Sequence, residues 1–442
     1  MISYDEALEC IKNNSISLES KTVKVIDALG LVCTQDITSP ENVPPFNNSA
    51  MDGFAVKSSI LKDASENNPI ILNVEGSTAA GDSLNEGGGE GAWEIMTGGP
   101  VPSAYDSVVK IEDIEILEEN DCGRPSRISI SVSSKIKQNI RNSGEDFQIG
   151  DLVITAGDII YPQHIMALSS LGISEISVNQ KPNISVISTG LELVDDISVP
   201  LKSGQIRNSN APYIISELSA MDIEAEYAGT IHDDVEHFEE TISDLLKGDS
   251  DIIISTGAVS MGRYDFIPDS LRKLGAEILF HKVAIRPGKP VLFAKFTIGK
   301  DSCGKDSRTK FYFGLPGNPV SAAIGLRFFT YPLIRNLQKL PEEMPLTATI
   351  SASEKKKSGF RFFRKAYMYN DQNGQLNVDV LNGQESFKIH SLLKANCWLM
   401  LPENKEIINM GELVKIYPLN PENINIGVLN YENKDSVIRR IS

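Results

Sequence analysis

The stretch GLPGNPVSAA, residues 314–323, joins an apolar strand pattern to a helix pattern through a glycine turn. Pro319 stands near the start of the predicted helix, a place that favours proline because its missing N–H is not needed there. The free N–H groups of this helix start would suit an anion. The segments ISTGLEL (187–193) and ISTGAVSMG (254–262) have the same form, since each places a glycine directly after an apolar strand.

Between these turns the chain alternates strand patterns with helix patterns. NISVIST, IEAEYAGTI and SDIIIST are typical of strands, whereas NSNAPYIISELSAMD and DVEHFEETISDLLKG have helical periodicity. Such alternation predicts a parallel sheet with both faces covered, in which the three glycine turns fall at one carboxyl edge. Ligands bind at that edge in open α/β folds, and Gly190, Gly257 and Gly317 would let the backbone approach a ligand closely. Any single turn of this kind can also serve packing alone.

The rest of the chain predicts three further regions around this α/β domain. Short apolar runs such as GFAV and RISISVS, separated by Gly, Asn, Asp and Ser clusters, predict an inserted β-rich domain. The predicted fold class is multi-domain α/β plus β: a central doubly wound, three-layer α/β domain, the β-rich domain, a small linking domain and a C-terminal β-barrel-like domain. The linking domain is expected at 1–47 with 147–180, and its first part, 1–25, can pack on the α/β domain. The β-rich domain is expected at 48–146, the α/β domain at 181–340 and the C-terminal domain at 341–420. Residues 421–442 are expected to form a polar tail.

The composition narrows the class of partner. The chain has 442 residues and a formal net charge of −17, which disfavours nucleic acid and anionic membranes as partners. Its five cysteines include no Cys-x-x-Cys pair, which argues against a zinc site or a disulfide framework and fits a reducing cytoplasm. The N-terminus lacks a signal-peptide pattern, and no apolar run approaches the roughly 18 residues of a membrane helix. We therefore expect a soluble, cytoplasmic protein.

A basic stretch reverses this acidic charge locally. Residues 278–300 contain no acid, and the turn at Pro287-Gly288 presents Arg286 and Lys289, with Lys282 just before it. In an acidic chain this is a candidate site for a phosphate or another oxyanion. The alternative is a basic strand edge that only aids solubility.

Several acids follow predicted strands or end loops, as carboxylates of a magnesium site beside phosphate often do. They are Glu192 after STG, Asp233 and Asp234 after a strand, Asp265 at the end of STGAVSMGRYD, and Asp146 at the end of IRNSGED, which also carries Arg141. The alternative is that these are exposed loop acids or helix caps, and Asp233 and Asp234 do precede a predicted helix.

Asp52 in NNSAMDGFAV (47–56) lies between Met51 and Gly53. Taken locally, Asp-Gly predicts a turn, because Asp bonds nearby backbone and Gly tolerates positive φ.

Eight motifs in order resemble those of the molybdopterin molybdenumtransferases, the MoeA family, which includes the E domain of gephyrin. They are PPFNNSAMDGFAV, IMTGGPVP, NIRNSGEDFQIGD, STGLELV, IRNSN, STGAVSMGRYDF, VAIRPGKPVLFAKF and FGLPGNPVSA. The likeness runs from about residue 3 to about residue 418.

The resemblance implies an elongated homodimer of four domains, with a molybdopterin-binding α/β domain. The activity that it implies is insertion of molybdate into adenylylated molybdopterin with magnesium and release of AMP, downstream of a molybdopterin adenylyltransferase. The active site would lie in a cleft between domains of two subunits. The small residues Ser49, Ala50 and Gly53 would then let the partner's crevice approach Asp52.

The resemblance also implies the site residues. The catalytic set is Asp52, Thr97, Asp146, Glu192 and Asp265; the substrate-binding set is Arg141, Lys282, Arg286, Lys289, Pro316, Gly317 and Pro319; the metal set is Asp233, Asp265 and Glu192, with Asp234 as an alternative to Asp233. Some positions depart from the family: Leu191 stands where an acid is common, Arg286 replaces a common Lys, and the frame around Ser386 and Ser391 is kept only loosely. The segment 299–310 is longer than usual and is expected to be an exposed loop.

Three alternatives stay open. Tungstate insertion would use the same residues, because tungstate and molybdate are nearly isosteric. A gephyrin-like binding scaffold would show erosion at several site positions, of which there is little. An adenylyltransferase for the same pterin would lack the domain that carries SAMDG and GED.

Overall fold

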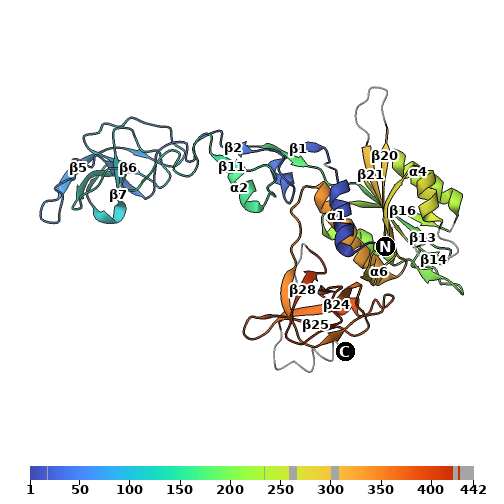
Figure 1. The fold of residues 1–442 in the computed structure, drawn as a ribbon. Helices are drawn as coiled ribbons and strands as arrows, with labels where there is room; N and C mark the ends of the chain where they lie inside the picture. Colours follow the sequence, from blue (N-terminus) through green and yellow to red (C-terminus); the bar gives the residue numbers. More distant parts are fainter. Residues whose placement is uncertain (17, 233, 258–265, 300–307, 422–426, 429–442) are drawn as a thin grey trace. The chain divides into compact units, whose positions relative to one another are not determined.

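The computed structural model describes the chain except for residue 17, residue 233 and the ranges 258–265, 300–307, 422–426 and 429–442 (Figure 1). The chain divides into two compact units, one of residues 20–178 and one of residues 1–19 with 179–442. In the described part of the chain, no helix has both the length and the apolar character needed to cross a bilayer.

A six-stranded sheet forms the centre of the second unit. Its order is β16 (Ala225–Ile231), β13 (Ile184–Thr189), β17 (Ile252–Thr256), β21 (Arg308–Leu315), β20 (Leu292–Ile298) and β18 (Glu277–His281). The first four strands are parallel, but β20 is antiparallel to both of its neighbours. The expectation of a wholly parallel sheet is therefore wrong at this edge. Because β20 and β21 are consecutive and no helix was expected between them, they can pair as a hairpin, which is antiparallel.

Helices cover both faces of this sheet, as predicted (Figure 1). Alternate strand residues point to opposite faces, so Ile252 and Ile254 join one core cluster and Ile253 the other. One face is covered by α1 (Tyr4–Asn14), α3 (Asn210–Ala220), α6 (Pro319–Gly325), the π-helix η3 (Leu326–Thr330) and α7 (Tyr331–Leu337), and the other by α4 (Val235–Lys247) and α5 (Ile267–Lys273). The three-layer α/β prediction is thus confirmed.

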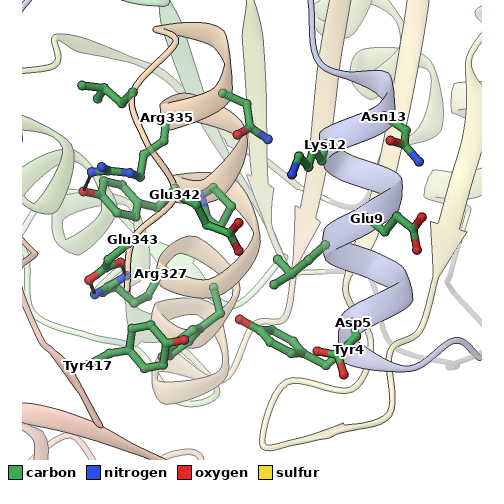
Figure 2. Close-up of a pocket in the computed structure, with 16 residues that line it drawn as sticks. Tyr4, Asp5, Glu9, Lys12, Asn13, Arg327, Arg335, Glu342, Glu343 and Tyr417 are labelled. Carbon is green, nitrogen blue, oxygen red and sulfur yellow. Dashed lines mark hydrogen bonds and ion pairs between the residues drawn. The ribbon is translucent and has the colours of Figure 1, made fainter. Parts of the chain in front are cut away.

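The N-terminal helix α1 packs on the α/β sheet through Tyr4, Ala7 and Ile11. Ser3 caps it, accepting from the Glu6 N–H at 3.2 Å while the Glu6 carboxylate accepts from the Ser3 N–H at 2.7 Å. Between α1 and the η3–α7 segment lies a groove of about 620 Å³ (Figure 2). On the side of the groove opposite α1, Arg327 makes a bidentate ion pair with Glu343, at 2.7 and 2.6 Å.

The C-terminal strands close into a five-stranded barrel, because β26 pairs with both β28 and β24. The strands are β22 (Leu346–Ile350), β24 (Arg361–Asn370), β25 (Leu376–Val380), β26 (Cys397–Leu401) and β28 (Leu413–Pro418). Arg361 links this barrel to α1, since its guanidinium bonds Asp5 at 2.6 and 2.9 Å and Glu403 at 2.9 Å. The strand β19 (Ile285–Arg286) pairs with β24, so the basic turn is attached to the barrel.

The first unit contains a second six-stranded sheet, the predicted β-rich domain. Its order is β7 (Ser107–Lys110), β4 (Gly53–Val56), β6 (Ala92–Ile95), β5 (Ile70–Thr78), β9 (Pro125–Ile130) and β8 (Ile114–Glu119). The segments that come before and after this sheet in the chain form a separate core, in which Val25, Ala28 and Leu31 pack against Leu168 and Ile176. The helix α2 (Pro162–Ser170) and the pairs β1–β12 (Ser20–Lys24, Glu175–Asn179) and β2–β11 (Ile37–Thr38, Leu152–Ile154) complete this small layer.

Candidate functional site

The three glycine turns of the α/β sheet meet at the carboxyl edge of β13, β17 and β21, as predicted. The Gly257 N–H donates to the Leu315 carbonyl at 3.1 Å, and a Cβ on Gly257 would collide with the Thr189 carbonyl. The nearest atom to a Cβ built on Gly317 is Gly257 Cα, at 3.6 Å. Because Gly257 has φ +101°, it also adopts a backbone conformation that side chains disfavour. The edge therefore depends on a side-chain-free residue at its centre.

Side chains fix the positions of these turns. Asn210, at the start of α3, donates from Nδ2 to the Gly317 carbonyl at 2.9 Å. The Thr189 hydroxyl donates to the Thr256 carbonyl at 3.1 Å, which ties the first turn to the second. The IRNSN motif thus holds the PGNP turn in place.

Asn208 is a residue of this edge to which the sequence assigned no role. It is buried, and its Nδ2 lies within 2.9 Å of Ser188 Oγ and Tyr227 Oη and 2.8 Å from Asp195 Oδ1. Burial would raise the pKa of Asp195, but hydrogen bonds from Asn208, Thr230 and Tyr227 outweigh it and lower that pKa. The signal in the sequence was an Asn two residues ahead of a helix, but the partners of its Nδ2 lie 13 to 20 positions away, so spacing alone could not identify them.

Glu192 is the described carboxylate of the predicted magnesium set. It is exposed, and its Oε2 lies 2.7 Å from the position of a Cβ on Gly190, so the carboxylate folds back over the first glycine turn. Asp233 and Asp265 lie outside the described residues. Asp234 caps α4, accepting from the His237 N–H at 3.1 Å, as an acid before a helix was expected to do. In the part of the chain that the structure describes, no three His, Cys, Asp or Glu side chains converge as metal ligands.

The basic turn lies against the start of α6. A Cβ on Gly288 would lie 3.4 Å from the Ser321 carbonyl, so the two segments predicted to bind anions adjoin. Arg286 is exposed and stacks over the Phe360 ring, 4.7 Å from its centroid. Lys282 has φ +88°, an uncommon conformation for a residue with a side chain. Such conformations persist where the surrounding fold imposes them and cluster at functional sites.

The expectation of free N–H groups at the start of α6 is wrong at Val320. The sequence predicted free N–H groups at this helix start, but the Val320 N–H donates to the Ser386 carbonyl at 3.0 Å. Pro319 has no N–H to offer, which leaves the helix start with fewer donors for an anion. The same contact brings Ser386, which lies where the sequence keeps the family's frame only loosely, onto the edge of the site through its backbone.

In the first unit, Asp52 and Thr97 form a close pair. The Thr97 N–H and hydroxyl both donate to Asp52 Oδ1, at 2.6 and 2.8 Å. These bonds, the backbone one first, lower the pKa of Asp52. A Cβ on Gly53 would lie 2.9 Å from Lys110 Cα and closer still to the Val109 carbonyl, so only glycine fits after Asp52. The chain bends at Asp52, but Gly53 is the first residue of β4 and has no positive φ, so the Asp-Gly turn that the local pattern predicted is not formed. The bend presents an ionised, exposed carboxylate.

Arg141 belongs to the same region of this unit. The strand pair β3–β10 (Asn48–Ser49, Ile140–Arg141) sets Arg141 opposite Asn48, and Ser49 bonds the backbone of Gly98 and Gly99 beside Thr97. Asp146 is exposed, and its N–H donates to the Val43 carbonyl at 2.9 Å.

Glu145, which the sequence passed over, is the carboxylate that shapes the GED turn. It accepts from the Asn142 N–H at 2.7 Å, and this bond is the first cause that lowers its pKa. The predicted residues therefore form two groups: Asp52, Thr97, Arg141 and Asp146 in one unit, and Glu192, Lys282, Arg286, Lys289, Pro316, Gly317 and Pro319 in the other.

Three family models match successive parts of the chain. Residues 185–336, which contain the glycine-turn edge, match the family described as "Probable molybdopterin binding domain". Residues 2–172 match the MoeA N-terminal region (domain I and II), and residues 347–419 match the MoeA C-terminal region (domain IV).

Full-length relatives extend the match. A molybdopterin molybdenumtransferase from Synechococcus elongatus is 32% identical over 428 residues, covering 95% of this chain and 100% of the relative. One from Haemophilus influenzae is 33% identical over 427 residues, covering 95% and 99%. The crystal structure of a molybdopterin biosynthesis MoeA protein from Pyrococcus horikosii matches with a TM-score of 0.78 at 27% identity, covering 95% of this chain and 99% of that one. The chain belongs to the MoeA family, as its motifs indicated.

Proposed function

We propose that this chain inserts molybdate into adenylylated molybdopterin and releases AMP. Membership of the MoeA family makes it a transferase of molybdenum cofactor biosynthesis. The observation that carries the more specific proposal is the meeting of three glycine turns beside a basic turn on one sheet edge. The adenylylated pterin carries a pyrophosphate, and binding this group requires both a backbone that can approach it closely and local positive charge.

The substrates are anions, whereas the chain carries a net charge of −17. Lys282, Arg286 and Lys289 would therefore gather the pyrophosphate and molybdate, which the rest of the surface repels. Arg286 offers a planar fork that suits an oxyanion. Pro316, Gly317 and Pro319 would shape the turn against which the pterin phosphate lies.

Magnesium is the proposed cofactor, and Glu192, Asp233 and Asp265 would hold it. Glu192 fits this role because it is an exposed carboxylate at the glycine-turn edge, and carboxylate oxygens suit a hard cation. When bound, the cation would polarise a phosphoryl oxygen and steady the departing AMP.

The second group of residues would complete the site from the partner subunit of a homodimer. Asp52, kept ionised by Thr97, and Asp146 would face the metal or the attacking oxygen. Arg141 would add positive charge toward the pterin phosphate. We place a molybdopterin adenylyltransferase upstream, as the source of the adenylylated substrate.

The test is an incubation of the full chain with adenylylated pterin, magnesium and molybdate, measuring AMP and metal in the product. We expect Asp52→Asn to lower AMP release by roughly 10²-fold or more, because the amide removes the negative charge that would face the metal or the attacking oxygen. The matched control is Asp63→Asn, an exposed acid in the same unit, which should keep wild-type turnover. Wild-type turnover in Asp52→Asn would refute the assignment, and a parallel incubation with tungstate shows which oxyanion the site takes.

A further inference from the structure

Lys365 is a buried lysine whose partners are backbone carbonyls. It lies on β24, is 1% exposed, and is the register partner of Trp398 on the neighbouring strand β26. Its ammonium donates to the carbonyls of Gly383 at 2.6 Å, Lys388 at 2.9 Å and Glu385 at 3.3 Å. An ammonium has three N–H donors, so this one segment uses all of them.

The segment 383–391 is organised around this side chain rather than around apolar packing. Gln384 reinforces the contact, because its side chain accepts from the Lys365 N–H at 3.0 Å and donates to the Lys365 carbonyl at 2.8 Å. The Ser391 hydroxyl shares the Gly383 carbonyl, at 2.7 Å. Phe387 and Ile389 are 62% and 41% exposed, so the large apolar side chains of the segment face outward while its backbone carbonyls are held inward.

This segment reaches the glycine-turn edge through α6. The Ser386 carbonyl accepts from the Val320 N–H at 3.0 Å, one residue after Pro319. A Cβ built on Gly288 of the basic turn would lie 3.4 Å from the carbonyl of the next residue of the same helix, Ser321. A shift of 383–391 would therefore move a direct partner of the helix that carries the PGNP turn.

We propose that Lys365 is a positioning residue, which holds segment 383–391 against the start of α6 and so sets the geometry of the proposed substrate site. It does not itself bind substrate, because its donors are taken. The charged groups that face it are Glu385 and Lys388, which pair with each other at 2.8 Å on the segment. Burial, the main cause, lowers the pKa of Lys365 to about 8, so it remains mostly charged at neutral pH.

The structural arm of the test is amide hydrogen exchange on the full chain. Lys365→Met keeps the length of the side chain but removes its donors, and we expect faster exchange in 383–391 and at Val320. The matched control is Lys356→Met in the same barrel: Lys356 is 6% exposed, and its ammonium bonds the Phe360 carbonyl at 3.1 Å. That control should leave 383–391 unchanged. Lys365→Arg should restore protection, since a guanidinium also offers several N–H donors.

The kinetic arm rests on the proposed function. We expect kcat/KM for the adenylylated pterin to fall by roughly tenfold to 10²-fold in Lys365→Met, as small misplacements of a site do. It should stay unchanged in Lys356→Met and recover in Lys365→Arg.

The two arms separate the ways in which the proposal can fail. Unchanged exchange in Lys365→Met overturns it, and so does altered exchange with wild-type kcat/KM. If the wild-type chain releases no AMP, the proposed function fails while the exchange arm still decides whether Lys365 holds the segment. If Lys365→Met does not fold, Lys365→Gln, which is shorter and neutral, takes its place with the same expected results.

Discussion

Two hydrogen bonds from Thr97 decide the charge of Asp52 at the residue scale. The pair is separated by 45 positions in the chain, yet the Thr97 N–H and hydroxyl both reach Asp52 Oδ1. A carboxylate whose ionised form accepts hydrogen bonds keeps its charge to lower pH. The stabilisation is present above the ordinary pKa of an Asp and is lost as pH falls through the lowered pKa.

Thr97→Val should therefore raise the pKa of Asp52. The variant keeps the backbone N–H, which is the larger cause, and loses only the hydroxyl bond. The carboxyl pKa should move toward its ordinary range, and the acid limb of kcat/KM should shift to higher pH if ionised Asp52 is required. NMR titration of Asp52 and a pH profile measure the two effects. An unchanged pKa in Thr97→Val would show that the hydroxyl has no part in holding the charge.

The cost of adding a side chain at Gly257 can be compared with the cost at Gly275, a glycine with a similar φ. Gly257 and Gly275 have φ of +101° and +92°, but of the two only Gly257 has atoms within 4 Å of the position that a Cβ would take. Gly275→Ala should cost about 1–3 kcal/mol through backbone strain alone. Gly257→Ala should cost more, since the Thr189 carbonyl must also move. Chemical denaturation gives both values, and equal losses would mean that the close approach at Gly257 carries no energy.

What the sequence can reveal of single residues depends on whether their partners are local. Gly190, Gly257 and Gly317 were recognised because a glycine after a strand is a local signal. Asn208 and Lys365 were missed, because their partners lie far along the chain or in segments without a regular pattern. Lys365 did carry one signal: it shares a strand face with Phe363, which is a buried position for a lysine.

At the scale of elements, alternation of strands and helices predicted the α/β layers but not the direction of β20. A strand pattern shows which residues are buried, and it says nothing about which way the strand runs. Closure of the C-terminal barrel was also not readable in detail, because the pairing of β26 with β24 joins strands separated by another strand and a long segment. Pairings of this kind are set by tertiary packing rather than by local sequence.

Asp233 and Asp234, two neighbouring acids ahead of α4, are proposed to have different roles. Asp234 caps the helix, and removing an N-cap side chain costs about 0.5–2 kcal/mol. Asp234→Ala should therefore lower the free energy of unfolding by that amount and leave AMP release intact. Asp233→Ala should do the reverse: normal stability, with AMP release that is weak and needs more magnesium.

Thermal or chemical unfolding, together with a magnesium titration of activity, distinguishes these two variants. Loss of activity in Asp234→Ala with wild-type activity in Asp233→Ala would exchange their roles. That result would make Asp234, rather than Asp233, the proposed magnesium ligand.

For the whole molecule, the proposal that a partner subunit completes the site leads to a complementation experiment. If Asp52 of one subunit serves the glycine-turn edge of its partner, a dimer of one Asp52→Asn chain and one Glu192→Gln chain has one site with both defects and one site with none. Mixed dimers, purified through two different tags, should then recover about half of wild-type AMP release, since a two-fold dimer has two equivalent sites. Each parent dimer should remain inactive, because both of its sites carry one defect. If both groups instead belong to one subunit, each site of the mixed dimer keeps a defect and no activity returns. Light scattering on the same samples gives the oligomeric state, and a monomeric wild-type chain with full turnover would equally contradict a shared site.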